Sequence, residues 1–431
     1  MTDPDQTFGS AATPRPTLGA RRRVAMLSWA TGGMIGWALV LVLVDALVAL
    51  GPAETIFIDT LWWSLAAFVA TALMIDRSIH APTAEGGIWV AFSTAVSFFG
   101  LLILFAVSHA AYSRSALTGA FLLQTAWLLL GVRLHMRLQV LRLGIPEPAT
   151  MAMLKASRDA LRGVRLTHVD AELIQSDVLE ELQQLDGAVI DRHTQKSEAL
   201  QRVITQLKLR GVRIYSTDHI HELLTGRLAL HHTEDSFLDD SSGRVLYVIV
   251  KRLLDLGSAF VLLLVLCVPM ALIAAAIRLI DHAPALFRQQ RVGRNGKVFL
   301  MNKFRTMRAE ELASDARVTT LGRVLRRYRL DELPQLFNVL GGTMSLIGPR
   351  PEWTATAAEF FDRIPHYPYR HLVRPGITGW AQVNQGHVTA LSDAMIKLEL
   401  DLYYVKHMSF ALDLVVGVRT LRTIVTGNGA Q

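Results

Sequence analysis

Residues 245–280 read VLYVIVKRLLDLGSAFVLLLVLCVPMALIAAAIRLI, and this stretch decides where the rest of the chain can lie. It is longer than the roughly 20 apolar residues that a helix needs to cross a bilayer. Basic residues stand near both of its ends, and Pro269 lies beyond its middle. Because proline removes a helical hydrogen bond and clashes with the preceding turn, we expect a kink at about 265–269.

The charges that follow this stretch indicate how such a helix sits in a membrane. Residues 281–330 hold twelve Lys/Arg and four Asp/Glu, a local balance of +8 against +7 for the whole 431-residue chain. A full crossing would put this basic block outside, although segments rich in Lys and Arg normally stay in the cytoplasm. A helix that enters, bends at Pro269 and returns keeps both basic ends on the cytoplasmic side. We therefore expect re-entry, with a kinked spanning helix as the alternative.

Four further apolar stretches precede this one, at 24–50, 56–75, 88–110 and 116–132. Each is close to the length of a spanning helix. The first is longer than the core of a signal peptide and has no small-residue cleavage site, so we interpret it as retained. Arginines before the first stretch and after the fourth place both flanks in the cytoplasm. With 51% hydrophobic and 19% charged residues, the composition also fits a chain that is partly in a membrane.

Residues 134–240 carry no long apolar run. Short β-like pieces at 138–143, 164–169, 188–190 and 212–215 alternate with helix-like ones such as 198–209. This alternation predicts a small, parallel, Rossmann-like α/β soluble domain. The sequence LGIP follows its first strand where a dinucleotide fingerprint would need glycines, so we expect no dinucleotide there. The single cysteine, Cys267, excludes an intrachain disulfide.

The sequence thus predicts an integral membrane protein of several domains. We expect a cytoplasmic N-terminal tail at 1–23, a transmembrane α-helical bundle of four helices at 24–133, the soluble α/β domain at 134–240, and a C-terminal α/β domain at 241–431 that begins with the re-entrant helix at about 245–280. The segment GRNGK at 293–297 is too short for a phosphate loop, so we interpret it as a β-turn.

A basic amphipathic helix precedes the segment that we expect to carry chemistry. Apolar residues recur at 321, 324, 325 and 328, and arginines lie on the other side. Such a helix can lie at a membrane interface or pack on a core. It runs directly into RLDELPQL at 329–336, where Asp331 and Glu332 are adjacent. Adjacent helical carboxylates point roughly 100° apart, so the two side chains are expected to do different work.

Asp331 and Glu332 have a chemical use in this setting. The basic residues before them are expected to lower a carboxylate pKa and keep the group ionised. An ionised carboxylate among phosphate-binding cations can attack phosphorus, and its neighbour can hold Mg²⁺ together with substrate phosphate oxygens. An isolated Asp-Glu pair is more often solvated helix surface, so the surrounding sequence has to decide.

The surrounding sequence contains ordered blocks, MNKFRTM at 301–307, NVLGGTMSLIGPRPE at 338–352, VRPGITGWAQVN at 373–384 and KLELDLYY at 397–404. Together with DELPQL they resemble the bacterial sugar transferase family, the polyprenyl-phosphate hexose-1-phosphate transferases with a single re-entrant helix. The resemblance runs from about residue 251 to the C-terminus. The preceding regions resemble the long form of this family, although they carry no comparably specific motif.

The resemblance implies a phosphoglycosyl transferase. Its helix would break at Pro269, Asp331 would be the nucleophile and Glu332 the Mg²⁺ ligand. The enzyme would transfer a hexose-1-phosphate from a UDP-sugar to polyprenyl (undecaprenyl) phosphate through a sugar-phosphoryl aspartate. This is the first membrane step of exopolysaccharide, capsule or O-antigen synthesis, on the cytoplasmic side of the bacterial inner membrane. The expected partners are these two substrates and the lipid bilayer, with no nucleic acid; a homodimer is left open.

The further candidate substrate-binding residues come from the same blocks. Guanidinium and ammonium groups suit phosphate, with a structural ion pair or a lipid headgroup contact as the alternative for each. The candidates of this kind are Lys303, Arg305, Arg350 and Arg374. A second set could form a nucleotide-facing turn or only a tight turn; it comprises Gly376, Thr378, Gly379 and Gln382. Asp401 is a candidate supporting carboxylate, with a salt bridge as the alternative.

Two other functions compete with transfer. A membrane phosphatase or diphosphate hydrolase would use the same aspartate but pass the phosphoryl group to water. A non-catalytic membrane scaffold would need no carboxylate pair, so the intact Asp331 and Glu332 disfavour it.

Overall fold

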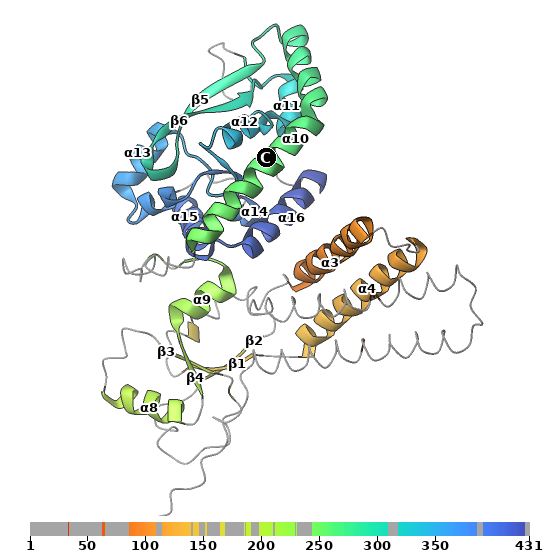
Figure 1. The fold of residues 1–431 in the computed structure, drawn as a ribbon. Coiled ribbons are helices and arrows are strands. Elements are labelled where there is room, and N and C mark those ends of the chain that lie inside the picture. The colour runs from red at the N-terminus through yellow and green to blue at the C-terminus, as the bar shows by residue number, and fades with distance from the viewer. Residues whose placement is uncertain are drawn as a thin grey trace, which may run out of the picture. The chain divides into compact units, whose positions relative to one another are not determined.

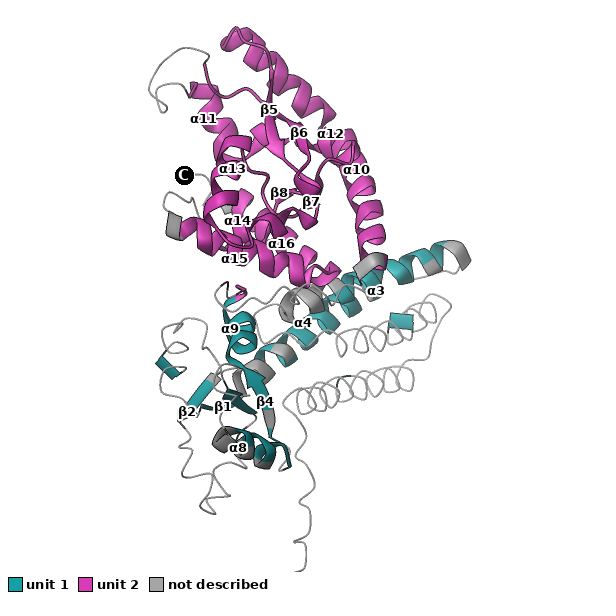
Figure 2. Cartoon of the chain, turned by 90° about the vertical axis from the view of Figure 1, so that its left-hand side faces the viewer, with its two compact units in different colours: residues 1–225 teal, residues 226–431 magenta. Residues whose placement is uncertain are grey.

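The computed structural model describes residues 33, 63–64, 86–108, 114–138, 141–145, 151–152, 164–168, 185, 187–190, 198–209, 212–228, 230, 244–308, 318–385 and 391–426. The chain divides into two compact units, residues 1–225 and 226–431 (Figure 2). The second unit begins at Gly226, and Leu228 N donates to Glu399 O of the same unit at 3.1 Å. The predicted boundary at 241 lies outside the described residues.

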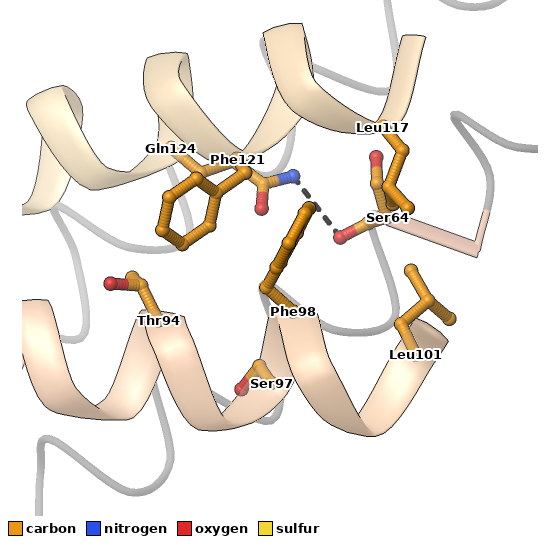
Figure 3. Close-up of a pocket in the computed structure, with 8 residues that line it drawn as sticks. All are labelled: Ser64, Thr94, Ser97, Phe98, Leu101, Leu117, Phe121 and Gln124. Carbon is orange, nitrogen blue, oxygen red and sulfur yellow. Dashed lines mark hydrogen bonds between the residues drawn. The ribbon is translucent and has the colours of Figure 1, made fainter. Parts of the chain in front are cut away.

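Two helices of the first unit form where the third and fourth membrane spans are predicted, α3 (Gly86–Ser108) and α4 (Arg114–Leu138). They pack through Leu101, Phe105 and Leu117. Figure 3 shows a pocket beside this contact, lined by apolar and small polar side chains, in which the Gln124 amide donates to the Ser64 carbonyl at 3.1 Å. The stretches at 24–50 and 56–75 lie outside the described residues apart from single positions, so the four-helix bundle stays a prediction.

The predicted parallel arrangement of strands is confirmed by a four-stranded sheet of order β2-β1-β3-β4, in which every pair is parallel. Its strands are β1 (Leu141–Ile145), β2 (Val164–His168), β3 (Gly187–Ile190) and β4 (Arg213–Ser216). Helix α8 (Glu198–Leu209) has the predicted bounds, and α9 (Thr217–Thr225) follows β4 directly. All four residues of β3 are buried, as expected for a central parallel strand covered on both faces.

The apolar stretch that opens the second unit forms one helix, α10 (Arg244–Ile280), with Pro269 inside it. Among the described residues, only the segment Leu246–Ile280 of this helix is long and apolar enough to cross a membrane. At about 1.5 Å per residue, α10 is roughly 55 Å long. Its helical assignment is unbroken, but its axis changes direction toward the C-terminal end (Figures 1 and 2). Re-entry through one membrane face stays a prediction.

One face of α10 packs along the second unit over most of its length. Ala259 belongs to a buried cluster with β6 and α12, and Ile277 to a second cluster farther along. The other face exposes large apolar side chains, including Phe260, Val265 and Leu272. An exposed apolar surface of this extent needs a covering, which lipid can provide.

The rest of the second unit contains two small sheets, whose strands are labelled in Figure 2. An antiparallel hairpin pairs β5 (Leu286–Val292) with β6 (Val298–Phe304), and β7 (Ser345–Ile347) pairs in parallel with β8 (Gly376–Thr378). The predicted turn at 293–297 joins β5 to β6, with positive φ at Asn295 and Gly296. The helices are α11 (Thr320–Arg327), α12 (Gln335–Leu340), α13 (Thr354–Arg363), α14 (Trp380–Asn384), α15 (Leu391–His407) and α16 (Phe410–Thr426).

Polar contacts fix the N-terminal part of α10 to this unit. The Asp413 carboxylate of α16 accepts hydrogen bonds from Tyr247 Oη at 2.5 Å and Lys251 Nζ at 2.6 Å. The next residue, Arg252, donates to the carbonyls of Val339 and Leu340 at the end of α12. A helix C-terminus carries unpaired carbonyls and partial negative charge, so an arginine there stabilises it.

Candidate active site

The carboxylate pair lies on a tight turn rather than on a continued helix. Helix α11 ends at Arg327, and Arg329 adopts a left-handed backbone with φ of 53°. The chain then forms a 3₁₀ turn, η6 (Leu330–Glu332). The expectation that the amphipathic helix runs directly into the pair is therefore wrong. The left-handed residue redirects the chain at a cost of about 1–2 kcal/mol, and the turn buries Asp331 and Glu332, with only 9% and 6% of their surfaces exposed.

An asparagine of α12 joins this turn to the hairpin. The Asn338 side-chain oxygen accepts from the backbone and side-chain nitrogens of Asn302, and its amide donates to the Leu300 carbonyl at 2.7 Å. These bonds hold β6 against the helix that follows the carboxylates. Lys303, next to Asn302, consequently reaches Glu332.

Glu332 lies between two cations. Its Oε1 is 2.8 Å from Arg350 Nη2 and 3.4 Å from Lys303 Nζ. Burial disfavours the charged carboxylate, but Arg350 and Lys303 outweigh it and hold the pKa of Glu332 at about 2. The pKa of Glu332 is thus lowered by basic neighbours, but chiefly by Arg350 and Lys303 rather than by the arginines of the preceding turn. Lys303 and Arg350, both candidate phosphate contacts, meet at the same oxygen of Glu332.

Asp331 differs from its neighbour. Its carboxylate accepts no hydrogen bond from any described residue, and burial followed by repulsion from Glu332 raises its pKa above the ordinary value of 3.8. The expectation of a lowered pKa is wrong for this residue, because Arg350 forms its direct contact with Glu332 instead. Asp331 is therefore a buried carboxylate whose oxygens remain uncommitted within the described part of the chain.

Close backbone packing positions Arg350. Gly348 N donates to Thr378 O at 2.8 Å, and Gly376 N donates to Pro349 O at 2.9 Å. A Cβ atom at Gly376 would lie 2.1 Å from the backbone nitrogen of Gly348, so no larger residue fits there. The glycines of the GITGW segment, residues 376–380, thus let two loops approach each other closely. From this junction the side chain of Arg350, which is 36% exposed, reaches Glu332.

The structure does not bring the other candidates to the carboxylate pair. Arg305 donates to Pro284 O at 3.1 Å and lies over the Phe287 ring, and Arg374 donates to Gly342 O at 3.0 Å. Asp401 is 1% exposed and forms an ion pair with Arg370 at 2.6 Å.

Two candidates of the GITGW segment have local partners. Thr378 Oγ1 shares a hydrogen bond with Thr420 at 2.7 Å, and the Gln382 amide donates to Ile377 O at 3.1 Å. A nucleotide contact by either residue stays a prediction, as do all the assigned roles in substrate binding.

Sequence reasoning missed a buried charge network behind the site. Arg370 Nη2 donates to Asp401 and also to the Arg350 carbonyl at 2.9 Å, while its Nη1 lies 3.4 Å from Glu352. Lys397 forms an ion pair with Glu352. Glu352 and Lys397 stand in the quoted blocks, but nothing in a single sequence pairs residues that are 45 positions apart.

The carboxylates of Asp331 and Glu332 fit a divalent metal ion whose remaining ligands come mainly from the substrate. Groups of three or more metal-ligating side chains are absent from the described residues. Mg²⁺ commonly takes one or two protein carboxylates and completes its shell with phosphate oxygens and water. Asp331 has free oxygens, and Glu332 has one oxygen, Oε2, outside its contacts with Lys303 and Arg350.

The comparisons with known proteins agree with the sequence resemblance. The family model described as bacterial sugar transferase matches residues 246–427. The chain is 41% identical over 194 residues to the uncharacterized sugar transferase EpsL of Bacillus subtilis (strain 168), which covers 43% of this chain and 91% of that protein. The chain belongs to the bacterial sugar transferase family.

Two longer relatives have more specific names. One is a UDP-N-acetylgalactosamine-undecaprenyl-phosphate N-acetylgalactosaminephosphotransferase of Aeromonas hydrophila, 40% identical over 239 residues, 54% of this chain and 56% of that protein. The other is a UDP-glucose:undecaprenyl-phosphate glucose-1-phosphate transferase of Xanthomonas campestris pv. campestris, 40% identical over 185 residues, 40% of this chain and 38% of that protein. The chain thus spans about half or less of the length of these relatives.

Proposed function

We propose that this chain transfers a sugar-1-phosphate from a UDP-sugar to undecaprenyl phosphate, with Asp331 as the nucleophile. The observation that carries the proposal is the buried turn at Asp331–Glu332, where one carboxylate is uncommitted and the other is held by Lys303 and Arg350. The names of the Aeromonas and Xanthomonas relatives support this substrate class. They name different sugars, so the sugar is left to experiment.

In the first step, a carboxylate oxygen of Asp331 attacks the sugar-bearing phosphorus of the donor. The bond from that phosphorus to the bridging oxygen breaks, and UMP leaves with the electron pair. The aspartate then carries the sugar-phosphoryl group as a mixed anhydride. Arg350 and Lys303 stabilise negative charge on the phosphoryl oxygens as it develops. When bound by the carboxylates, Mg²⁺ would supply further charge neutralisation on the phosphate oxygens.

In the second step, a phosphate oxygen of the lipid attacks the same phosphorus. The acyl phosphate bond breaks, Asp331 is regenerated as a carboxylate, and the product is a lipid diphosphate sugar. The anhydride keeps the reactivity of the original phosphate bond, so neither step needs another energy source. A hydrolase would share the first step but pass the group to water.

The path of α10 supports a cytoplasmic-face, monotopic placement of this unit in the inner membrane. Asp255 near its start accepts from Ser345 Oγ at 2.7 Å, and Ile277 near its end packs with Phe304 and Leu325. These two residues are about 33 Å apart along a straight helix, which exceeds the hydrocarbon thickness of about 30 Å. Both ends nevertheless contact the same unit, as a helix that enters and returns would allow.

The test uses full-length protein in nanodiscs with Mg²⁺, a short polyprenyl phosphate and a panel of nucleotide-sugars. We expect UMP release that depends on the lipid phosphate, with one donor preferred, and its loss in Asp331→Asn. Radiolabel from the donor sugar should remain on wild-type protein when the lipid is omitted. Lipid-independent, continuous UMP release would indicate a hydrolase, and no release from any donor by folded protein would indicate a scaffold.

A further inference from the structure

The hairpin that presents Lys303 carries a second basic residue on the same face. Residues 287, 289 and 291 of β5 pair with residues 303, 301 and 299 of β6. Directly opposed residues of antiparallel strands project to the same side, and successive residues alternate. Arg291 therefore shares a face with Lys303 and with Met301, which is buried in the core, whereas Arg288 lies on the opposite face.

The Arg291 guanidinium is held in place but only partly satisfied. Its Nη2 donates to Gln289 Oε1 at 2.6 Å and its Nη1 to Pro351 O at 3.2 Å. Its Nε is buried and has no acceptor among the described residues, and no described carboxylate forms an ion pair with it. Each Nη group has two N–H donors and uses one of them, so two Nη donors remain for another acceptor.

Arg291 adds positive charge to a site where Lys303 and Arg350 already match the two carboxylates of the turn, Asp331 and Glu332. Burial and then the nearby Arg350 lower the pKa of Arg291, while Glu352 and Glu332 oppose the shift. The pKa of Lys303 is lowered by the same two causes. Partly buried cations that repel one another are costly unless an anion compensates them. Glu352 is already paired with Arg370 and Lys397, so it offers Arg291 no direct contact.

We infer that Arg291 is a third phosphate-binding cation of the site and donates through its Nη groups to the diphosphate of the nucleotide donor. The inference rests on the proposed function for the identity of the donor. A diphosphate spreads its negative charge over oxygens on two phosphorus atoms, so it can contact three separate cations at once more easily than a single phosphate group can. Gln289 and the Pro351 carbonyl orient the guanidinium of Arg291. Because Arg350 directly precedes Pro351, this contact also brings Arg291 close to Arg350.

The test compares Arg291→Gln with Arg288→Gln in the full chain in nanodiscs. Arg288 is exposed on the opposite face of the same strand and is the matched control. Calorimetry with UDP and Mg²⁺ should show about tenfold weaker binding in Arg291→Gln and less than a twofold change in Arg288→Gln. KM for the UDP-sugar should rise by a similar factor, and KM for polyprenyl phosphate should stay unchanged. Arg291→Lys should recover part of the affinity.

The outcomes separate this inference from the proposed function. Unchanged UDP affinity with a lower kcat would show that Arg291 only holds the Pro351 segment, and a raised KM for the lipid alone would place it at the acceptor; either result overturns the inference. If wild-type protein releases no UMP, the proposed function fails, while the UDP-binding comparison still judges Arg291. Should Arg291→Gln not fold, Arg291→Lys must weaken UDP binding by at least about threefold, or the inference is wrong.

Discussion

The turn at Asp331–Glu332 and the network around Arg370 both bury charge, but they balance it differently. In the network, Arg370 and Lys397 face Glu352 and Asp401, and all four side chains have a partner of opposite charge. At the turn, Glu332 forms ion pairs with Lys303 and Arg350, whereas Asp331 accepts no hydrogen bond within the described residues. A closed network stabilises a structure, whereas an open one leaves groups available for a substrate.

The two regions are also connected. Arg370 donates to the backbone carbonyl of Arg350, so the closed network supports the main chain whose side chain reaches Glu332. Asp401, predicted as a supporting carboxylate or a salt-bridge partner, forms an ion pair with Arg370. The comparison therefore predicts losses of stability from changes in the network and losses of activity from changes at the turn.

The largest loss of stability is expected for Arg370→Met. The change leaves Asp401 buried, charged and without its partner, which typically costs about 3–5 kcal/mol. The melting temperature of the protein in nanodiscs should fall by roughly 10 °C. The double variant Arg370→Met/Asp401→Leu should recover much of that loss, because no lone charge remains. A single variant as stable as wild type would show that the network is not closed.

Opposite shifts are expected from the two adjacent carboxylates. Glu332 has a pKa of about 2, so its stabilisation is present above the unfolded pKa near 4.5 and is lost as pH falls toward 2. Glu332→Gln should therefore cost about 3 kcal/mol at pH 7. The raised pKa of Asp331 means that its ionised form destabilises the fold at neutral pH, so Asp331→Asn should raise the melting temperature. Equal shifts in one direction would contradict the assignment of roles.

The acid side of the pH–rate profile should depend on Arg350. As the proposed nucleophile, Asp331 must be ionised to attack, so kcat should fall as pH drops through its raised pKa, above the ordinary 3.8. Arg350 lowers that pKa, and Arg350→Gln should move the acid limb to higher pH by several tenths of a unit to about one unit. Single-turnover UMP release across pH 4–8 measures the shift. Arg363→Gln, which breaks an exposed pair with Glu359, is the control and should leave the limb in place.

Much of this fold could be predicted from local pattern. The apolar run 245–280, helix 198–209 and the alternating strands of the first unit follow from periodicity and are present. The sequence identified Glu332 and Arg350 as candidates for one site, but it did not predict that they pair. The left-handed backbone at Arg329 was not predicted, because nothing in a sequence separates an arginine that tertiary packing holds at positive φ from an ordinary helical arginine. The same limit explains the wrong direction for the pKa of Asp331.

The smallest effect is expected from Arg305→Met, and it is the sharpest check of the site's boundary. The KFRTM block makes Arg305 as plausible a phosphate contact as Lys303, two residues earlier. The side chain instead donates to Pro284 O and lies 5.7 Å from the centre of the Phe287 ring. Loss of this exposed contact should cost about 0.5–1 kcal/mol of stability and change KM for the UDP-sugar less than twofold. Lys303→Met, its comparison variant, should raise that KM by about tenfold or more because it removes a cation that contacts Glu332. If both variants weakened donor binding equally, the phosphate site would extend past β6 and would include Arg305 as well as the residues at the Asp331–Glu332 turn.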